Sequence, residues 1–155
     1  MTTRALVARA PGLLARALGT VAAVAVLAPI ARAAEAAHPV KVVYHLTQGL
    51  EEATRGLQNV RNHLKADPTA KIVVVANGAG IDFLLDGAKD AHGNPYDAIV
   101  QDLVSQGVEF RVCHNTLETR KIDPAKVLPE AKAVPSGVAE VARLQSREGF
   151  AYLRP

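Results

Sequence analysis

The chain has 155 residues and a net charge of +3, but that charge arises in its first 36 residues. Four of the 18 basic residues and one of the 15 acidic residues lie there, so 14 of each remain in the rest of the chain. This balanced remainder has no basic cluster of the kind that a phosphate backbone selects, which excludes nucleic acid as an expected partner.

The first 36 residues are typical of a secretory leader. Three arginines precede an uncharged apolar run from Ala17 to Ile30, and Ala31-Arg32-Ala33 matches a small-x-small cleavage site. This combination predicts a signal peptide over residues 1–36, cleaved near residues 33–36. The apolar run is shorter than the roughly 20 residues of a membrane span, and no twin-arginine pair is present. We therefore expect Sec-type export, to the periplasm or another exported location, with no membrane span after cleavage. A transit peptide and an uncut anchor are the alternatives.

Residues 37–155 alternate between patterns typical of strands and of helices. Branched apolar runs predict strands, and apolar residues at helical spacing predict helices. The expected strands cover residues 40–46, 71–76, 108–113, 131–134 and 149–153, and the expected helices cover 51–65, 81–85, 96–106, 117–121 and 137–147. This order predicts a single three-layer α/β domain with a mostly parallel five-stranded sheet of the flavodoxin or Rossmann type.

Three polar segments follow expected strands directly. They are His45-Leu-Thr-Gln-Gly, Asn77-Gly-Ala-Gly and Cys113-His-Asn-Thr. In parallel sheets, ligands and reactive groups gather at the carboxyl ends of the strands. We therefore expect the functional site at this edge of the sheet.

Cys113 is the single cysteine of the chain, so an internal disulfide is excluded. The thiol is then free, paired between chains, or used in chemistry. Asn115 and Thr116 are good helix N-caps, which predicts a helix start close to the sulfur. The N–H groups and dipole of a helix start favour a thiolate, so Cys113 is the expected catalytic residue. An inert buried thiol is the alternative.

The other two segments supply expected partners for the thiol. His45 ends the first strand and can face the same crevice, whereas His114 follows Cys113 directly and points to the opposite face of the strand. The glycine turn after the second strand permits close backbone approach, but it is not G-x-G-x-x-G and lacks a P-loop lysine, so no nucleotide is expected. The expected ligand-binding residues are His45, Asn77, Gly78, Gly80, His114, Asn115 and Thr116.

Metal and cofactor chemistry is not expected from these residues. The five histidines show no paired ligand spacing, and one cysteine cannot form C-x-x-C. No G-x-S-x-G elbow is present, so a serine hydrolase is not expected either.

The chain from Val40 to Pro155 resembles the DsrE/DsrF-like family of small sulfur-relay proteins. The resemblance lies in Gly-Val-Glu-Phe-Arg-Val-Cys-His-Asn-Thr-Leu around Cys113 and in the Leu-Gln-x-x-Glu-Gly-Phe-Ala-Tyr-Leu tail. It implies a parallel α/β sheet and assembly into homo-trimers or homo-hexamers. In members that transfer sulfur, it implies a persulfide on the cysteine that matches Cys113.

These observations favour an exported sulfur-handling protein in which Cys113 is a persulfide carrier. Such a protein acts as a sulfurtransferase or a sulfur carrier, with a donor or acceptor protein as partner. The alternatives are a non-catalytic oligomeric module that binds a small ligand or a protein, and a structural subunit. The residues alone leave the choice open.

Overall fold

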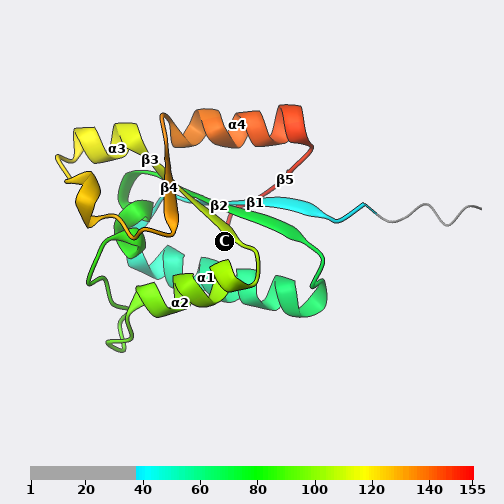
Figure 1. Cartoon of the computed structure of the whole chain (residues 1–155), viewed down its shortest axis with the longest axis horizontal. Coiled ribbons are helices and arrows are strands. Elements are labelled where there is room, and N and C mark those ends of the chain that lie inside the picture. Colours follow the sequence, from blue (N-terminus) through cyan, green and yellow to red (C-terminus); the bar gives the residue numbers. More distant parts are fainter. Residues whose placement is uncertain (1–37) are drawn as a thin grey trace, which may run out of the picture. The chain divides into compact units, whose positions relative to one another are not determined.

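A parallel sheet between two layers of helices forms the frame of the protein in the computed structural model, which describes residues 38–155 (Figure 1). Its strands are β1 (Lys41–Leu46), β2 (Lys71–Ala76), β3 (Glu109–Cys113), β4 (Ala131–Val134) and β5 (Ala151–Leu153). They lie in the order β4-β3-β2-β1-β5, and every neighbouring pair is parallel. The expected three-layer α/β fold is confirmed, and the sheet in this part of the chain is wholly parallel.

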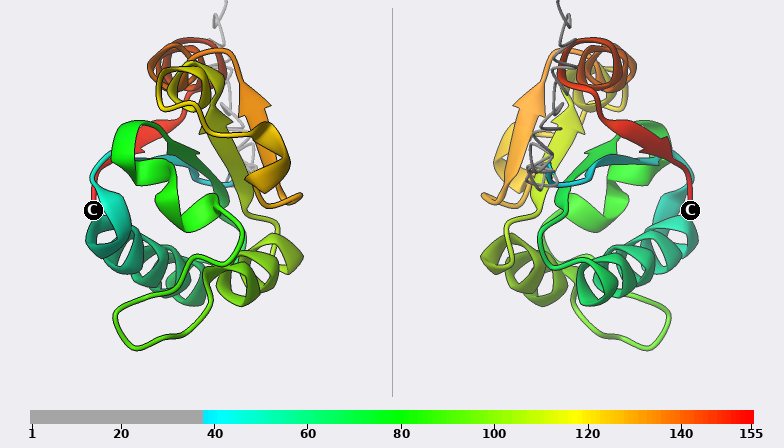
Figure 2. Two further views of the ribbon diagram at one scale, coloured as in Figure 1. Left: turned by 90° about the vertical axis from the view of Figure 1, so that its left-hand side faces the viewer. Right: turned by 90° about the vertical axis from the view of Figure 1, so that its right-hand side faces the viewer.

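Helices cover the two faces unequally, as the edge-on views in Figure 2 show. The helices α1 (Gly49–Ala66) and α2 (Tyr96–Ser105) cover one face, and α3 (His114–Thr119) and α4 (Gly137–Glu148) lie on the other. The 3-10 helix η1 (Gly78–Leu84) packs on the α1 side, and a short 3-10 turn, η2 (Pro124–Lys126), links α3 to β4.

The apolar core is divided between these faces in the same way. On the α1 side, the ring of Phe83 packs edge-on against Tyr96 and against Phe110, within a large aliphatic cluster. The cluster on the α4 side is much smaller and consists of Val43, Val73, Val75, Val141, Leu144 and Phe150. With so little apolar surface beneath it, α4 relies more on polar contacts for its position on the sheet.

Element boundaries differ from the sequence-based expectation by up to three residues, and the starts of four elements differ most. The expected helix 81–85 is the 3-10 helix η1, which begins at Gly78. Helix α1 begins at Gly49, two residues early, because the buried Glu52 carboxylate accepts the N–H groups of Thr47 and Gln48 and so holds the loop before it. Helix α3 begins at His114 instead of residue 117. Gly149 ends α4 in a left-handed conformation, with φ of +74°, so β5 starts at Ala151 and not at residue 149.

The leader expected from the sequence, residues 1–36, lies outside the described residues. Across residues 38–155, no helix combines the length and the apolar character needed to cross a membrane.

Candidate functional site: a thiol at the carboxyl edge of the sheet

Cys113 is the last residue of β3, and α3 begins at the next residue. The neighbouring strand ends bring two other segments to the same place. Asn77 follows β2 on one side of β3, and Ser136 and Gly137, where α4 starts, follow β4 on the other. Three segments far apart in the sequence therefore meet around one sulfur atom.

The side chain of Cys113 is only 5% exposed, but it lines an open hollow of about 310 Å³. We call this space the thiol hollow. Its other lining residues are Asn77, Gly78, Asn115, Thr116, Thr119, Arg120, Ser136 and Val138. Six of these eight residues have polar side chains, so the sulfur lies beside a hollow that is open to solvent and is not sealed within aliphatic side chains.

The surroundings of Cys113 act on the thiol in opposite directions. Burial raises the pKa of the Cys113 thiol, because a charged sulfur is poorly solvated there. Hydrogen bonds from the Thr116 hydroxyl and from the backbone N–H groups of Gly137, Thr116 and Asn115 lower it. The hydrogen bonds prevail, and the pKa lies below its ordinary value. The site therefore favours a thiolate.

The orientation of the Thr116 hydroxyl follows from its second partner. Gly78 has φ of +59°, a left-handed conformation that suits glycine, and its N–H donates to Thr116 Oγ1 at 3.0 Å. Because the oxygen accepts there, its single proton is left to donate to the sulfur. Thr116 thus acts from the first turn of α3. The expectation that Asn115 and Thr116 are N-caps is wrong, since the N-cap position is Cys113 itself.

Two glycines allow the close packing around the site. A Cβ atom on Gly137 would lie 3.2 Å from Cys113 Cβ and 3.0 Å from Asn77 Cβ, so only glycine lets the start of α4 approach the sulfur this closely. A Cβ atom on Gly80 would lie 2.2 Å from the carbonyl oxygen of Leu46. Gly80 therefore packs the glycine turn against β1 and does not line the thiol hollow.

The structure gathers four of the expected residues around Cys113: Asn77, Gly78, Asn115 and Thr116. The two histidines lie elsewhere. His45 directs Nε2 to Asn77 Oδ1 at 2.8 Å and Nδ1 to the Tyr152 hydroxyl at 3.2 Å. His114 is exposed and pairs with Glu118 at 3.3 Å. Neither histidine lines the thiol hollow.

Sequence reasoning missed Gly137, Ser136 and Arg120. Ser136-Gly137 follows the expected strand 131–134, so the strand-end rule that selected the other segments would also have found it. Arg120 had no such signal. Its guanidinium donates to the Gly78 carbonyl at 3.0 Å and to Asp82 at 2.6 Å, contacts that cross about 40 residues of sequence.

Within residues 38–155, no three His, Cys, Asp or Glu side chains gather closely enough to hold a metal ion.

A wholly parallel sheet with a hydrogen-bonded thiol at its carboxyl edge defines a small α/β thiol protein. Residues 30–155 match the DsrE/DsrF-like family, and the chain belongs to that family. It is 33% identical to MTH1491, a protein of unknown function from Methanobacterium thermoautotrophicum, with a TM-score of 0.67 over 75% of this chain and 99% of that one. It also shares its fold with the ychN protein from E. coli, with a TM-score of 0.62 and 14% identity over 76% of this chain and 100% of that one. No curated protein matches the chain.

Proposed function

We propose that this protein carries sulfane sulfur on Cys113. The observation that carries this proposal is the set of four hydrogen-bond donors around a sulfur atom that lines an open hollow. Membership of a family that includes sulfur-relay proteins supports the same class of function. The donors matter because the thiolate, and not the thiol, is the nucleophile.

The reaction needs no external oxidant or reductant. The Cys113 thiolate attacks the outer sulfur of a persulfide or polysulfide donor. A new S–S bond forms at Cys113, the donor's own S–S bond breaks, and its electron pair leaves on the donor thiolate. An acceptor thiolate then attacks the outer sulfur on Cys113, which regenerates the Cys113 thiolate. The four donors stabilise the anion before and after each transfer.

Intact-mass measurement after treatment with polysulfide tests this proposal. The protein should gain the mass of one or more sulfur atoms, and a thiol reductant should remove them. Cys113→Ser should gain none, because the chain has no other cysteine. A wild-type protein that takes up no sulfur under these conditions overturns the proposal.

A non-catalytic binding module is the second candidate, and the low exposure of Cys113 favours it. Val138 adds an apolar contact surface at the rim of the thiol hollow, with 58% of the residue exposed. In this case the hollow binds a small ligand or a partner segment without covalent chemistry. Cys113→Ser would then keep binding, and iodoacetamide would modify the wild-type thiol no faster than an ordinary buried thiol.

We also propose that the protein works as an exported homo-oligomer. Arginines before an apolar run and a cleavage site support export. The edge strand β5 supports oligomerisation, because all three of its residues are exposed and its outer edge is free of a partner strand within residues 38–155. Sequencing the amino terminus of the exported protein, and native mass spectrometry of the mature chain, test the two parts separately.

A further inference from the structure

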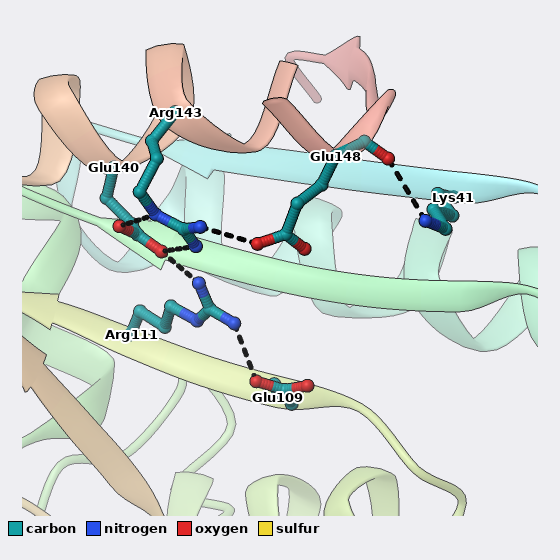
Figure 3. A network of polar contacts seen from close by, with 6 residues as sticks. All are labelled: Lys41, Glu109, Arg111, Glu140, Arg143 and Glu148. Carbon is teal, nitrogen blue, oxygen red and sulfur yellow. Dashed lines mark hydrogen bonds and ion pairs between the residues drawn. The ribbon is translucent and has the colours of Figure 1, made fainter. Parts of the chain in front are cut away.

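A chain of ion pairs crosses the thinly covered face of the sheet between β3 and α4 (Figure 3). Arg111 on β3 bonds to Glu140 on α4 and to Glu109 at 2.8 Å. Arg143 bonds to both oxygens of Glu140, at 2.8 and 2.9 Å, and to Glu148 at 2.5 Å. Glu140 therefore receives two guanidinium groups, one from the sheet and one from its own helix.

The link between Arg111 and Glu140 is the most buried part of this chain of ion pairs. The side chains of Arg111 and Glu140 are 13% and 11% exposed, whereas Glu148 and Glu109 lie at the more exposed ends. A pair screened from water in this way is held more firmly than a surface pair. It is a polar contact that joins α4 to β3 directly.

The position of this pair relates it directly to the thiol. Arg111 precedes Cys113 by two residues on β3, so both side chains project toward the α4 face. Glu140 follows Gly137 by three residues, which places both in the first turn of α4. The same strand and the same helix turn thus meet twice, once at the ion pair and once where Gly137 packs against Cys113. A Cβ atom on Gly137 would lie 3.2 Å from Cys113 Cβ, and from this position the Gly137 N–H lowers the pKa of the thiol.

Besides this ion pair, the start of α4 is held from the preceding residues, because the Asn115 N–H donates to the Pro135 carbonyl at 3.3 Å and Val134 pairs with Cys113. The helix buries Val141 and Leu144 beyond that turn, while Val138 within it is exposed. We infer that Arg111 and Glu140 are positioning residues for the Cys113 thiolate, because their ion pair holds the start of α4 where the Gly137 N–H reaches the sulfur. This inference rests on the proposed function, in which the thiolate is the reactive form.

Substitution of Glu140 tests the inference, because two explanations predict opposite signs. By charge alone, Glu140→Gln removes a negative group near the sulfur and lowers the pKa of the thiol. If the pair positions α4, the same variant weakens the Gly137 hydrogen bond and raises that pKa. The thiol pKa is measured from the rate of iodoacetamide alkylation as a function of pH. We expect the thiol pKa to rise by about half a unit in Glu140→Gln, which slows alkylation roughly threefold at neutral pH.

Two further variants make the result decisive. Glu148→Gln removes the same charge from the far end of α4 and should leave the thiol pKa unchanged. Arg111→Met/Glu140→Met removes both charges together, leaves no unpaired buried charge, and should raise the thiol pKa as Glu140→Gln does. The other charged groups at the thiol hollow, Arg120 and its partner Asp82, stay in place in every variant.

The outcomes separate this inference from the proposed function. If the wild-type pKa is low and Glu140→Gln leaves it unchanged or lowers it, the positioning role is wrong while the thiolate remains. If both Glu140 variants lower the melting temperature without moving the alkylation profile, the pair is merely structural and the inference also fails. An ordinary thiol pKa in the wild type instead removes the basis of the proposed function itself.

Discussion

His45 Nε2 lies 2.8 Å from Asn77 Oδ1, so a hydrogen bond joins the end of β1 to the glycine turn after β2. The acceptor is an amide oxygen, which requires Nε2 to be the protonated nitrogen of the ring. The other nitrogen, Nδ1, then accepts from the Tyr152 hydroxyl when the ring is neutral. The ring is thus occupied on both sides by groups other than Cys113.

From this arrangement we expect His45→Ala to leave the thiol pKa of Cys113 within about 0.2 units of the wild-type value, because the pKa responds to groups that contact the sulfur. The alkylation rate measured against pH tests this expectation. A clear rise of the thiol pKa in His45→Ala would show that the ring acts on the sulfur after all.

Thr116→Val should raise the thiol pKa of Cys113, because it removes the hydroxyl that donates to the sulfur and accepts from Gly78. We expect a shift of about half a unit to one unit, in keeping with one lost hydrogen bond to an anion. Thr119→Val is the matched control. Thr119 also lines the thiol hollow, but its hydroxyl donates to the Asn115 carbonyl. Equal shifts in the two variants would contradict the role given to Thr116.

Gly137→Ala should both destabilise the protein and raise the thiol pKa. The added methyl group would lie 3.2 Å from Cys113 Cβ and 3.0 Å from Asn77 Cβ, so the start of α4 and these neighbours must separate by a few tenths of an ångström. We expect a loss of about 1–2 kcal/mol in the free energy of unfolding. Urea denaturation and the alkylation profile measure the two effects. Val138→Ala, at the neighbouring exposed position, should change neither.

The stability of the protein should depend on Glu140 in acid. Hydrogen bonds from Arg143, and then from Arg111, outweigh the effect of burial and lower the pKa of Glu140 from 4.5 to about 2. Because the folded pKa lies below the unfolded one, this stabilisation is complete above about pH 4.5 and is lost as the pH falls toward 2. Its size is on the order of 3 kcal/mol.

The test compares wild type with Glu140→Gln by urea denaturation at several pH values. The difference in unfolding free energy should be largest near pH 6 and should shrink as the pH falls toward 2. A difference that stays constant over this range would show that the Glu140 charge is not its source.

Glu52→Ala should be among the more damaging single substitutions outside the apolar core. Glu52 is 2% exposed, and its carboxylate accepts the N–H groups of Thr47 and Gln48 and lies 3.6 Å from Arg154. Removing it leaves two N–H groups without their partner, at a cost of about 2–3 kcal/mol. Glu51→Ala, next to it on α1 and exposed, should cost no more than about 0.5 kcal/mol. Thermal or urea unfolding distinguishes the two.

The sequence alone determined the order of strands and helices, the parallel sheet and the position of Cys113 at its carboxyl edge. Branched runs such as Lys71–Ala76 are local signals, and strands that alternate with helices leave few topologies open. Asn77, Gly78, Asn115 and Thr116 followed from the same reasoning, because each stands directly after an expected strand.

Only the tertiary structure decided which groups reach the sulfur. Three features of the site depend on contacts between residues that are 24 to 38 positions apart in the sequence. They are the approach of the Gly137 N–H to Cys113, the direction that Gly78 gives to the Thr116 hydroxyl, and the ion pair between Arg111 and Glu140. The ring of His45 was expected at the thiol and instead bonds to Asn77 and Tyr152. Local sequence patterns specify where a strand ends, whereas the orientation of a side chain depends on the neighbouring residues that tertiary packing brings next to it.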